Sequence, residues 1–411
     1  MTTLDSSLMQ VRITGVDSIG LTHSITQILA TYNATILDIG QADIHESLNL
    51  GILIHVKNKI VDALLDELSH KCIELGVDPH FKTVTPQAYE DWVRQQGKNR
   101  YILTVLGRRV TAHQIAKTSE IISAQGLNID SIKRLTGRIP LHKSISNLRA
   151  CIEFSLRGTP TNQKQMQRQL MELSSELQVD YSLQEDNMHR RMRRLICFDM
   201  DSTLIQTEVI DELAMRAGVG DRVKAITESA MRGEIDFKES FKERVALLKG
   251  LDESVMKDIA ENLPITEGLD RLMYVLKKYG YKTAILSGGF TYFGAYLQNK
   301  YDFDYVYANQ LEIEDGKLTG KYLGEIVDGQ RKMELLQEIA AKEKVDLAQT
   351  IAVGDGANDL PMINAAGLGI AFHAKPKVQA NADQAINTIG IDGVLYFLGF
   401  KDSNLDEVGK L

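Results

Sequence analysis

The pattern that most restricts the fold is an alternation of short apolar strands and helices that begins at residue 195. An apolar strand at 195–198 is followed by further apolar runs at 282–286, 305–308, 350–353 and 369–371, with helical segments between them. Strands separated by helices favour a parallel sheet with helices on both faces, a doubly wound, Rossmann-like α/β fold. Ligands bind such sheets beyond the carboxyl ends of the strands. The polar residues that follow each strand are therefore the candidates for function.

Two carboxylates, Asp199 and Asp201, follow the first of these strands, and Thr203 comes two positions later. Carboxylates at this spacing can share a hard cation and divide the work of nucleophile and proton donor. Taken alone, the same string is also typical of a turn whose carboxylates cap a helix.

Two further candidates follow later in the chain. Ser287 and Gly288 come directly after the strand at 282–286, where a hydroxyl and a backbone N–H suit a phosphate, although such a pair is also common in plain turns. Lys332 begins a helix expected at 331–343 and could neutralise a phosphoryl oxygen, although a lone lysine is usually solvated.

The last candidate is an acidic cluster after the strand at 350–353, in which Asp355, Asn358 and Asp359 stand beside glycines. Four such pieces, in this order and at strand ends, are far more specific than any one of them. Together they resemble the motifs of the haloacid dehalogenase-like (HAD) superfamily, phosphotransferases with an aspartate nucleophile. The resemblance covers residues 194–405.

That resemblance implies a role for each residue. Asp199 would attack phosphorus, and Asp201 would protonate the leaving oxygen and then deprotonate water. Ser287, the Gly288 N–H and Lys332 would hold the transferring group. A Mg²⁺ cofactor would be bound by Asp199, by the backbone carbonyl of Asp201 and by Asp355. Thr203, Asn358 and Asp359 would support this arrangement. Asn358 is also expected to contact the substrate.

About 80 residues separate the first motif from the second, and they are expected to form a helical cap at 208–265 that excludes water and selects the substrate. Residues in it resemble the phosphoserine phosphatase subgroup. By that resemblance Glu208 would meet an ammonium group, Arg244 a carboxylate, and Met231 and Phe237 would close the pocket. The alternative is that Glu208 caps a helix and Arg244 forms a surface ion pair.

The implied activity is hydrolysis of O-phospho-L-serine to L-serine, the last step of serine biosynthesis, through an aspartyl-phosphate. Two alternatives stay open. One is a phosphatase or phosphotransferase for another small amino-alcohol phosphate, which would use the same catalytic residues. The other is an amino-acid-sensing protein whose phosphatase domain is a relic, against which the intact motifs argue.

The front of the chain contains two successive β-α-β-β-α-β patterns, at 8–85 and 98–185, joined by a short helical linker. They resemble tandem ACT domains, ferredoxin-like α+β modules that bind amino acids. In the first, Gly15, Asp17 and Gly20 form a turn before a helix, where N–H groups suit a carboxylate and Asp17 an amino group. The second lacks the Asp and the second Gly. For this second unit a structural or dimerising role is equally open. L-serine is the expected effector of the first unit, where the alternative is that Asp17 is a plain turn residue.

Charge and cysteine usage restrict the partners. The 411 residues carry 47 Lys and Arg against 55 Asp and Glu, a net charge of −8, which argues against a nucleic-acid partner. The basic run at 189–194 is therefore interpreted as a solvated strand entry rather than a nucleic-acid patch.

Three scattered cysteines predict neither disulfides nor a zinc site and suit a cytoplasmic protein. No membrane segment is expected, and exposed strand edges favour a homodimer.

Overall fold

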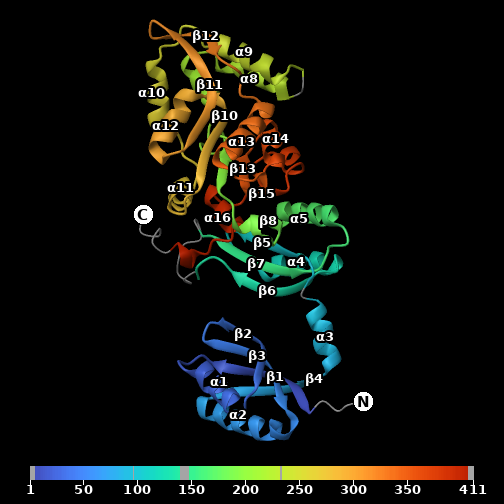
Figure 1. Cartoon of the computed structure of the whole chain (residues 1–411). Helices are drawn as coiled ribbons and strands as arrows, with labels where there is room; N and C mark the ends of the chain where they lie inside the picture. Colours follow the sequence, from blue (N-terminus) through green and yellow to red (C-terminus); the bar gives the residue numbers. More distant parts are fainter. Residues whose placement is uncertain (1–4, 96, 139–147, 232–233, 406–411) are drawn as a thin grey trace. The chain divides into compact units, whose positions relative to one another are not determined.

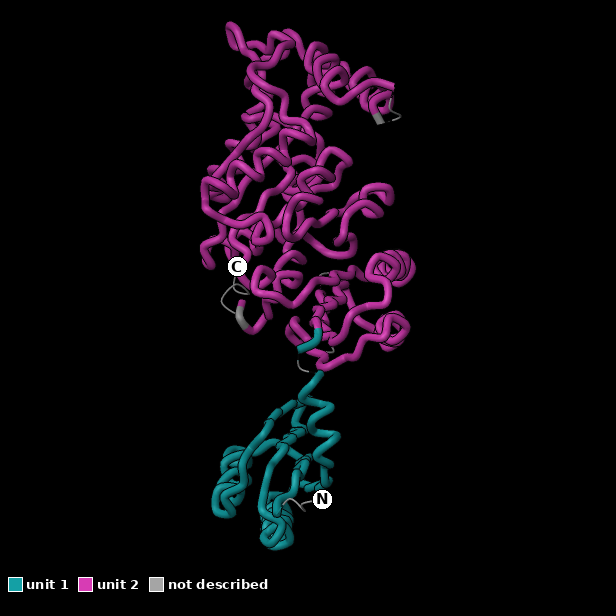
Figure 2. The backbone as a smooth tube through the Cα atoms, turned by 45° about the vertical axis from the view of Figure 1, so that its right-hand side comes forward, with its two compact units in different colours: residues 1–98 teal, residues 99–411 magenta. Residues whose placement is uncertain are grey.

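A computed structural model describes residues 5–95, 97–138, 148–231 and 234–405. The chain divides into two compact units, residues 1–98 and residues 99–411, which are coloured separately in Figure 2. Among the described helices, none combines the length and apolar character needed to cross a membrane.

The first unit contains one antiparallel sheet of order β2-β3-β1-β4, which we call the first sheet domain (residues 5–84) (Figure 1). Alternate residues of β1 are buried, and α1 buries Leu21, Ile25, Ile28 and Leu29, the face that the sequence pattern predicts. Helix α3 (Pro86–Arg94) follows the domain. Its elements are β1 (Ser6–Val16), α1 (Leu21–Thr31), β2 (Thr35–Ile44), β3 (Ser47–Lys57), α2 (Val61–Leu75) and β4 (Val77–Val84).

The second unit begins with another antiparallel sheet, of order β6-β7-β5-β8, which we call the second sheet domain (residues 100–185). Its elements follow the same β-α-β-β-α-β order. They are β5 (Arg100–Gly107), α4 (Ala112–Ala124), β6 (Asn128–Arg134), β7 (Ala150–Arg157), α5 (Gln163–Leu177) and β8 (Asp180–Glu185). The short helix α6 (Met188–Arg191) leads into the remainder of the unit.

The large domain (residues 195–405) is built on a seven-stranded sheet of order β12-β11-β10-β9-β13-β14-β15. Every pairing is parallel except that of β11 with β12, which form an antiparallel edge hairpin. The expectation of a parallel, doubly wound sheet is confirmed, but the sequence analysis missed β12 and β15 and ended β11 six residues early. The strands are β9 (Leu195–Phe198), β10 (Lys282–Phe290), β11 (Tyr305–Glu314), β12 (Lys317–Leu323), β13 (Thr350–Gly354), β14 (Leu368–Phe372) and β15 (Gln384–Ile386).

Helices cover both faces of this sheet because successive strand side chains point to opposite sides. Leu195 and Cys197 of β9 lie in one apolar core with residues of α13 and α14, whereas Ile196 and Phe198 lie in another with residues of α11 and α12. The helices outside the cap are α11 (Leu269–Lys278), α12 (Thr291–Tyr301), α13 (Gly329–Glu343), α14 (Leu360–Ala365), α15 (Pro376–Gln379) and α16 (Val394–Phe397).

Four helices form a cap between β9 and β10: α7 (Val209–Arg216), α8 (Gly220–Met231), α9 (Phe237–Ala246) and α10 (Ser254–Glu261). The segment between α9 and α10 pairs with β12, since Gly250 N–H donates to the Leu318 carbonyl at 2.8 Å and Leu318 N–H donates to Leu251 at 2.9 Å. The unforeseen hairpin therefore supports the cap.

The second sheet domain and the large domain share a core. Leu106 and Cys151 of the sheet domain are fully buried in the same apolar cluster as Val394 and Phe397 of α16. Polar contacts reinforce this interface between the two domains, which we call the joint. The Asp180 carboxylate accepts hydrogen bonds from the backbone N–H of Asn387 and Thr388, at 2.8 and 3.1 Å, and from the Thr388 hydroxyl.

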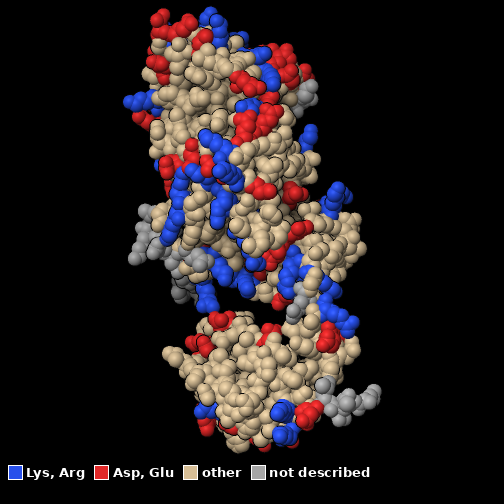
Figure 3. All heavy atoms as spheres, in the orientation of Figure 1, with Lys and Arg blue, Asp and Glu red and all other residues tan. Residues whose placement is uncertain are grey.

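The basic run at 189–194 is not simply a solvated strand entry, and that expectation is wrong for two of its members. Arg190 and Arg193 are only 8% and 4% exposed at the joint. Over the face of the molecule shown in Figure 3, basic and acidic side chains both occur widely.

Candidate active site

The site forms at the carboxyl edge of the large sheet, where the segments after β9, β10 and β13 meet the start of α13. Lys332, in the first turn of α13, is fully buried, and its Nζ lies 2.9 Å from Asp199 Oδ1 and 2.6 Å from Asp359 Oδ1. Three pieces that are far apart in the sequence are thereby brought into direct contact. Parallel strands explain this convergence, because their carboxyl ends lie at one edge.

Asp199, Asp355 and Asp359 form a carboxylate cluster in which one oxygen from each lies within 4.8 Å of the others. The Thr203 hydroxyl donates to Asp355 Oδ1 at 3.2 Å, and Gly356 N–H donates to Asp359 Oδ2 at 2.9 Å, which fixes two of the three carboxylates. Oxygen ligands in this number fit a hard divalent cation. Asp359 enters the cluster directly, although the sequence analysis gave it only a supporting role.

The Asp201 side chain is held apart from that cluster, beside the end of β10. Val209 N–H donates to its Oδ1 at 3.3 Å. A Cβ placed on Gly289 would lie 2.6 Å from Asp201 Oδ2 and 3.1 Å from Ser287 Oγ. A side chain at position 289 would therefore crowd Asp201 and Ser287, which explains the glycine there.

Ser287 is fully buried within β10, which continues to Phe290 instead of ending at residue 286 as expected. Its Oγ accepts a hydrogen bond from Gly289 N–H at 2.9 Å. The Gly288 carbonyl accepts from Asn309 Nδ2 at 2.8 Å, which fixes this peptide.

Burial controls the proton affinities of the site. It raises the pKa of Asp199, with Asp359 adding to the effect and Lys332 opposing it. Burial also raises the pKa of Asp201, reinforced by the charges of Glu208 and Asp199. For Asp355, burial and then Asp359 raise the pKa to about 7. Burial acts to lower the pKa of Lys332, but Asp199 and Asp359 outweigh it and raise that pKa.

The cap places two charged side chains near these groups. Glu208 precedes α7, and its Oε1 accepts from the Ser202 hydroxyl at 2.7 Å, so its side chain does not cap the helix. Arg244 of α9 is partly buried, and its Nε donates to the Ser240 carbonyl at 3.2 Å. Within the described part of the chain, no carboxylate forms an ion pair with Arg244. Burial lowers the pKa of its guanidinium, while Glu208, Asp211 and Asp201 act to raise it.

Aromatic side chains close the apolar side of the site. The Phe237 ring would lie 3.2 Å from a Cβ on Gly288, and it stacks on Phe241 with ring centroids 6.5 Å apart. Met231 ends α8, but its side chain lies outside the described residues, as do positions 232 and 233.

An ion pair that sequence analysis missed joins the cap to α13. Lys238 Nζ lies 3.0 Å from Asp328 Oδ2, and Asp328 is the N-cap of the helix that carries Lys332. No sequence signal distinguished Lys238 from other exposed lysines.

Asn358 is partly buried, and its backbone carbonyl would lie 2.5 Å from a Cβ on Gly329 at the start of α13.

In the first sheet domain, the expected turn begins later than predicted. Gly15 belongs to β1 and abuts Val77, whose Cγ1 would lie 2.6 Å from a Cβ there. Gly20 is the N-cap of α1 with φ 91°, and Asp17 is exposed, its N–H donating to the Glu46 carbonyl.

Comparisons with known proteins cover both halves of the chain. A haloacid dehalogenase-like hydrolase model matches residues 196–364, and two ACT domain models match residues 7–82 and 100–184. The phosphoserine phosphatase of Streptomyces coelicolor is 38% identical over 409 residues, covering 100% of this chain and 96% of that protein. The Mycobacterium tuberculosis phosphoserine phosphatase is 36% identical, covering 95% and 92%. A crystal structure of a probable phosphoserine phosphatase from Vibrio cholerae, unliganded, has a TM-score of 0.56 and 37% identity, covering 72% of this chain and 86% of that one.

Proposed function

The chain belongs to the phosphoserine phosphatase family of haloacid dehalogenase-like hydrolases, and on that premise we propose that it hydrolyses O-phospho-L-serine through an aspartyl-phosphate on Asp199. The observation that carries the proposal is the meeting of Asp199, Lys332 and the carboxylate cluster at one sheet edge. A nucleophile, a fixed ammonium and oxygen ligands for a cation are the groups that phosphoryl transfer requires.

In the first step, a carboxylate oxygen of Asp199 forms a bond to phosphorus while the bond from phosphorus to the serine oxygen breaks. Asp201 gives its proton to that oxygen, and L-serine leaves. The raised pKa of Asp201, caused first by burial, supports its holding a proton at the start. Lys332 and Ser287 stabilise the charge on the transferring group.

In the second step, water attacks the phosphorus of the aspartyl-phosphate and gives its proton to Asp201. The bond from phosphorus to Asp199 breaks, phosphate leaves, and the enzyme returns to its starting state. Met200 N–H donates to Asp199 Oδ1 at 2.7 Å, which keeps the nucleophile oriented between the steps.

We further propose Mg²⁺ as the cofactor, bound by Asp199, Asp355 and the Asp201 carbonyl, with Asp359 close by. The carboxylate cluster fits a hard cation of this kind. Bound there, the ion would neutralise charge on the phosphoryl oxygens.

Arg244 and Glu208 supply the selectivity for a zwitterionic substrate in this proposal. Arg244 would bind the serine carboxylate and Glu208 the ammonium group, since each charge attracts its opposite. The partly buried guanidinium, which forms no ion pair with described residues, supports this role.

The test compares Arg244→Ala with Lys242→Ala, an exposed neighbour on the same helix. We expect kcat/KM on O-phospho-L-serine to fall roughly 10- to 100-fold for Arg244→Ala, because a charge-assisted hydrogen bond is lost. Activity on p-nitrophenyl phosphate should change only a few-fold, and Lys242→Ala should resemble wild type on both substrates. An equal loss on both substrates for Arg244→Ala would remove the carboxylate-binding role.

We also propose that the first sheet domain binds L-serine at the turn of Asp17 and Gly20 and that the chain forms a homodimer. The matches to ACT domains support the effector.

The edge strand β2 exposes Ile36, Ile39 and Ile44, which supports pairing with a second copy. The described cysteines are free and buried, which suits a reducing, cytoplasmic compartment. Calorimetry with L-serine tests the effector, and absence of heat would exclude it.

A further inference from the structure

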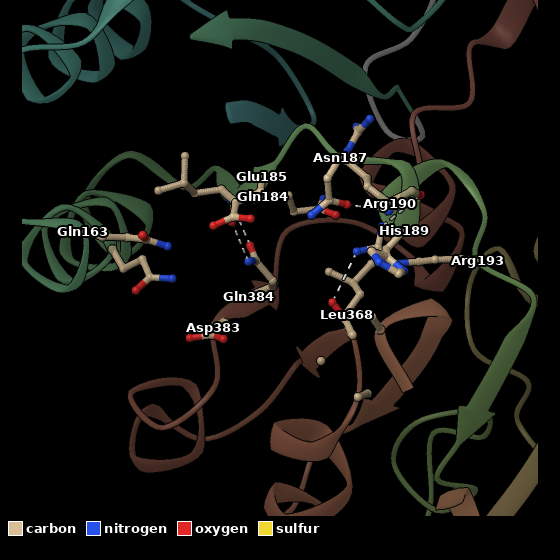
Figure 4. Close-up of a pocket in the computed structure, with 16 residues that line it drawn as sticks. Gln163, Gln184, Glu185, Asn187, His189, Arg190, Arg193, Leu368, Asp383 and Gln384 are labelled. Carbon is tan, nitrogen blue, oxygen red and sulfur yellow. Dashed lines mark hydrogen bonds between the residues drawn. The ribbon is translucent and has the colours of Figure 1, made fainter. Parts of the chain in front are cut away.

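A cavity of about 270 Å³ lies at the joint between the second sheet domain and the large domain (Figure 4). Residues of α5 and β8 line one wall, α6 and the segment after it line a second, and the region of β14 and β15 lines a third. It is separate from the candidate active site, because none of the catalytic side chains lines it.

Two buried arginines belong to this cavity. Arg190 has a carboxylate partner, with Nη2 3.2 Å from Glu153 Oε2. Arg193 has none among the described residues: its Nη1 donates to the Arg190 carbonyl and its Nη2 to the Gly367 carbonyl, each at 3.3 Å. Arg193, a residue that is only 4% exposed, therefore donates these two hydrogen bonds to neutral carbonyl oxygens.

Hydrogen-bonding capacity is also left over at the cavity. The Nε atoms of Arg190 and Arg193 and the Oε1 of Gln184 are buried without a hydrogen-bond partner in the described part of the chain. An unpaired buried polar atom costs roughly 1 to 3 kcal/mol, and more when it is charged.

The charges around the cavity are separated. Figure 4 shows His189, Arg190 and Arg193 gathered on one side and Gln163 and Asp383 on the opposite side. The lining acids, Glu185 and Asp383, are exposed, whereas the two arginines are buried. The buried end is therefore cationic and suits an anion.

We propose that this cavity is a binding site for a small metabolite with an oxyanion head group, carboxylate or phosphate, whose charge is paired by Arg193. Such a ligand accepts hydrogen bonds from the side-chain amides of Gln163 and Gln167 of the second sheet domain and from Arg193, which is itself bonded to Gly367 of the large domain. It therefore binds only when the two domains are docked. The lowered pKa of Arg193, to about 10, has burial as its first cause and the charge of Arg190 as its second, and the charge of a bound anion would oppose both effects.

The position of Arg193 relates the site to catalysis. Arg193 lies two residues before β9, and Asp199 directly follows that strand, whereas Gly367 directly precedes β14 in the same sheet. A ligand paired with Arg193 thus stabilises the start of the strand that carries the proposed nucleophile.

The direct test locates selenate in crystals of the full chain by its anomalous scattering. We expect a peak within hydrogen-bonding distance of the Arg193 guanidinium, besides any peak in the active site. Competition with inorganic phosphate or with L-serine then identifies the head group, and displacement by either one supports the site. Selenate in the active site with none at Arg193 would overturn the proposal.

A solution test uses Arg193→Met, with Arg194→Met as the matched control because Arg194 is exposed next to it. Sulfate should raise the Tm of wild type and of Arg194→Met at similar concentrations, whereas Arg193→Met should need about tenfold more. Equal sulfate dependence in all three proteins would contradict the proposal. So would a Tm loss in Arg193→Met that is constant at every sulfate concentration, which would indicate a purely structural arginine.

Discussion

The two sheet domains have the same order of elements but different places in the molecule. The first has an apolar core of its own, around Val11, Ile25 and Leu64, and belongs to a unit separate from the catalytic machinery. The second also has a core of its own, around Leu103, Phe154 and Met166, but Leu106 and Cys151 are buried in the core of the large domain, which belongs to the same unit. Similar sequence patterns thus produce one independent module and one that is part of the catalytic unit.

The difference originates in the edge strands. In the first sheet domain the edge strand β4, the counterpart of β8, buries only Val77. In the second, β8 is buried, and Leu183 exchanges two hydrogen bonds with the Gln384 side chain of the large domain, at 3.1 and 3.0 Å. An amide side chain therefore pairs with an edge that would otherwise be open.

The largest expected effect comes from core truncations in the two domains. Leu106→Ala should destabilise the catalytic unit by about 2–5 kcal/mol, because Leu106 is fully buried in the shared core. The Tm of phosphatase activity should then fall by roughly 5–15 °C. Leu50→Ala, equally buried in the first sheet domain, should leave the heat stability of activity unchanged. If both variants lost activity at the same lower temperature, the two domains would not differ as described.

The effect of pH on stability through the joint should be somewhat smaller than the effect of the core truncations. Burial raises the pKa of Asp180 from 3.8 to about 6, against its hydrogen bonds from Thr388 and Asn387. The folded protein therefore binds this proton more tightly than the unfolded chain. The resulting stability, about 3 kcal/mol, is fully present below pH 4 and is lost as the pH rises through 6.

Asp180→Asn mimics the protonated acid and should remove this dependence. Relative to the variant, wild type should lose stability between pH 4 and pH 7, as measured by Tm in matched buffers. Asp383→Asn, an exposed carboxylate near the same joint, should keep the wild-type profile. Parallel curves for wild type and Asp180→Asn would show that the buried carboxyl does not titrate in this range.

The smallest expected effect concerns Arg108. Its guanidinium forms a bidentate salt bridge with the Glu267 carboxylate, at 2.6 and 2.9 Å, across the same joint. Both side chains are about one-third exposed, so Arg108→Met should cost about 1 kcal/mol or less. Added salt should reduce the difference from wild type. Arg109→Met, next to it and exposed, serves as the control. A loss as large as that of Leu106→Ala would mean that charge, not the shared core, holds the joint.

The sequence predicts most of the site because the chemistry restricts it. Asp199 and Asp355 follow strands, Ser287 lies near the end of one and Lys332 is in the first turn of a helix, and a parallel sheet brings such positions to one edge. Periodicity likewise predicts the buried face of α1. These signals are local or depend only on the order of elements.

What the sequence did not predict depends on contacts between distant segments. The burial of Arg190 and Arg193 arises from docking of the second sheet domain, and a run of basic letters gives no sign of it. The hairpin of β11 and β12 has charged residues around its turn that weaken its strand pattern, and only its pairing with the cap segment shows its role. The ion pair of Lys238 with Asp328 spans 90 positions in the same way.

The most direct test of the phosphatase assignment is phosphate release from O-phospho-L-serine by the full chain and by Asp199→Asn. We expect rapid release by wild type in the presence of Mg²⁺ and a loss of roughly 1,000-fold or more in the variant, because the amide cannot form the covalent intermediate. Asp302→Asn, whose side chain is 93% exposed at the end of α12, should retain the wild-type rate. Phosphate release by Asp199→Asn at a rate near that of wild type, or none by wild type, would contradict the assignment.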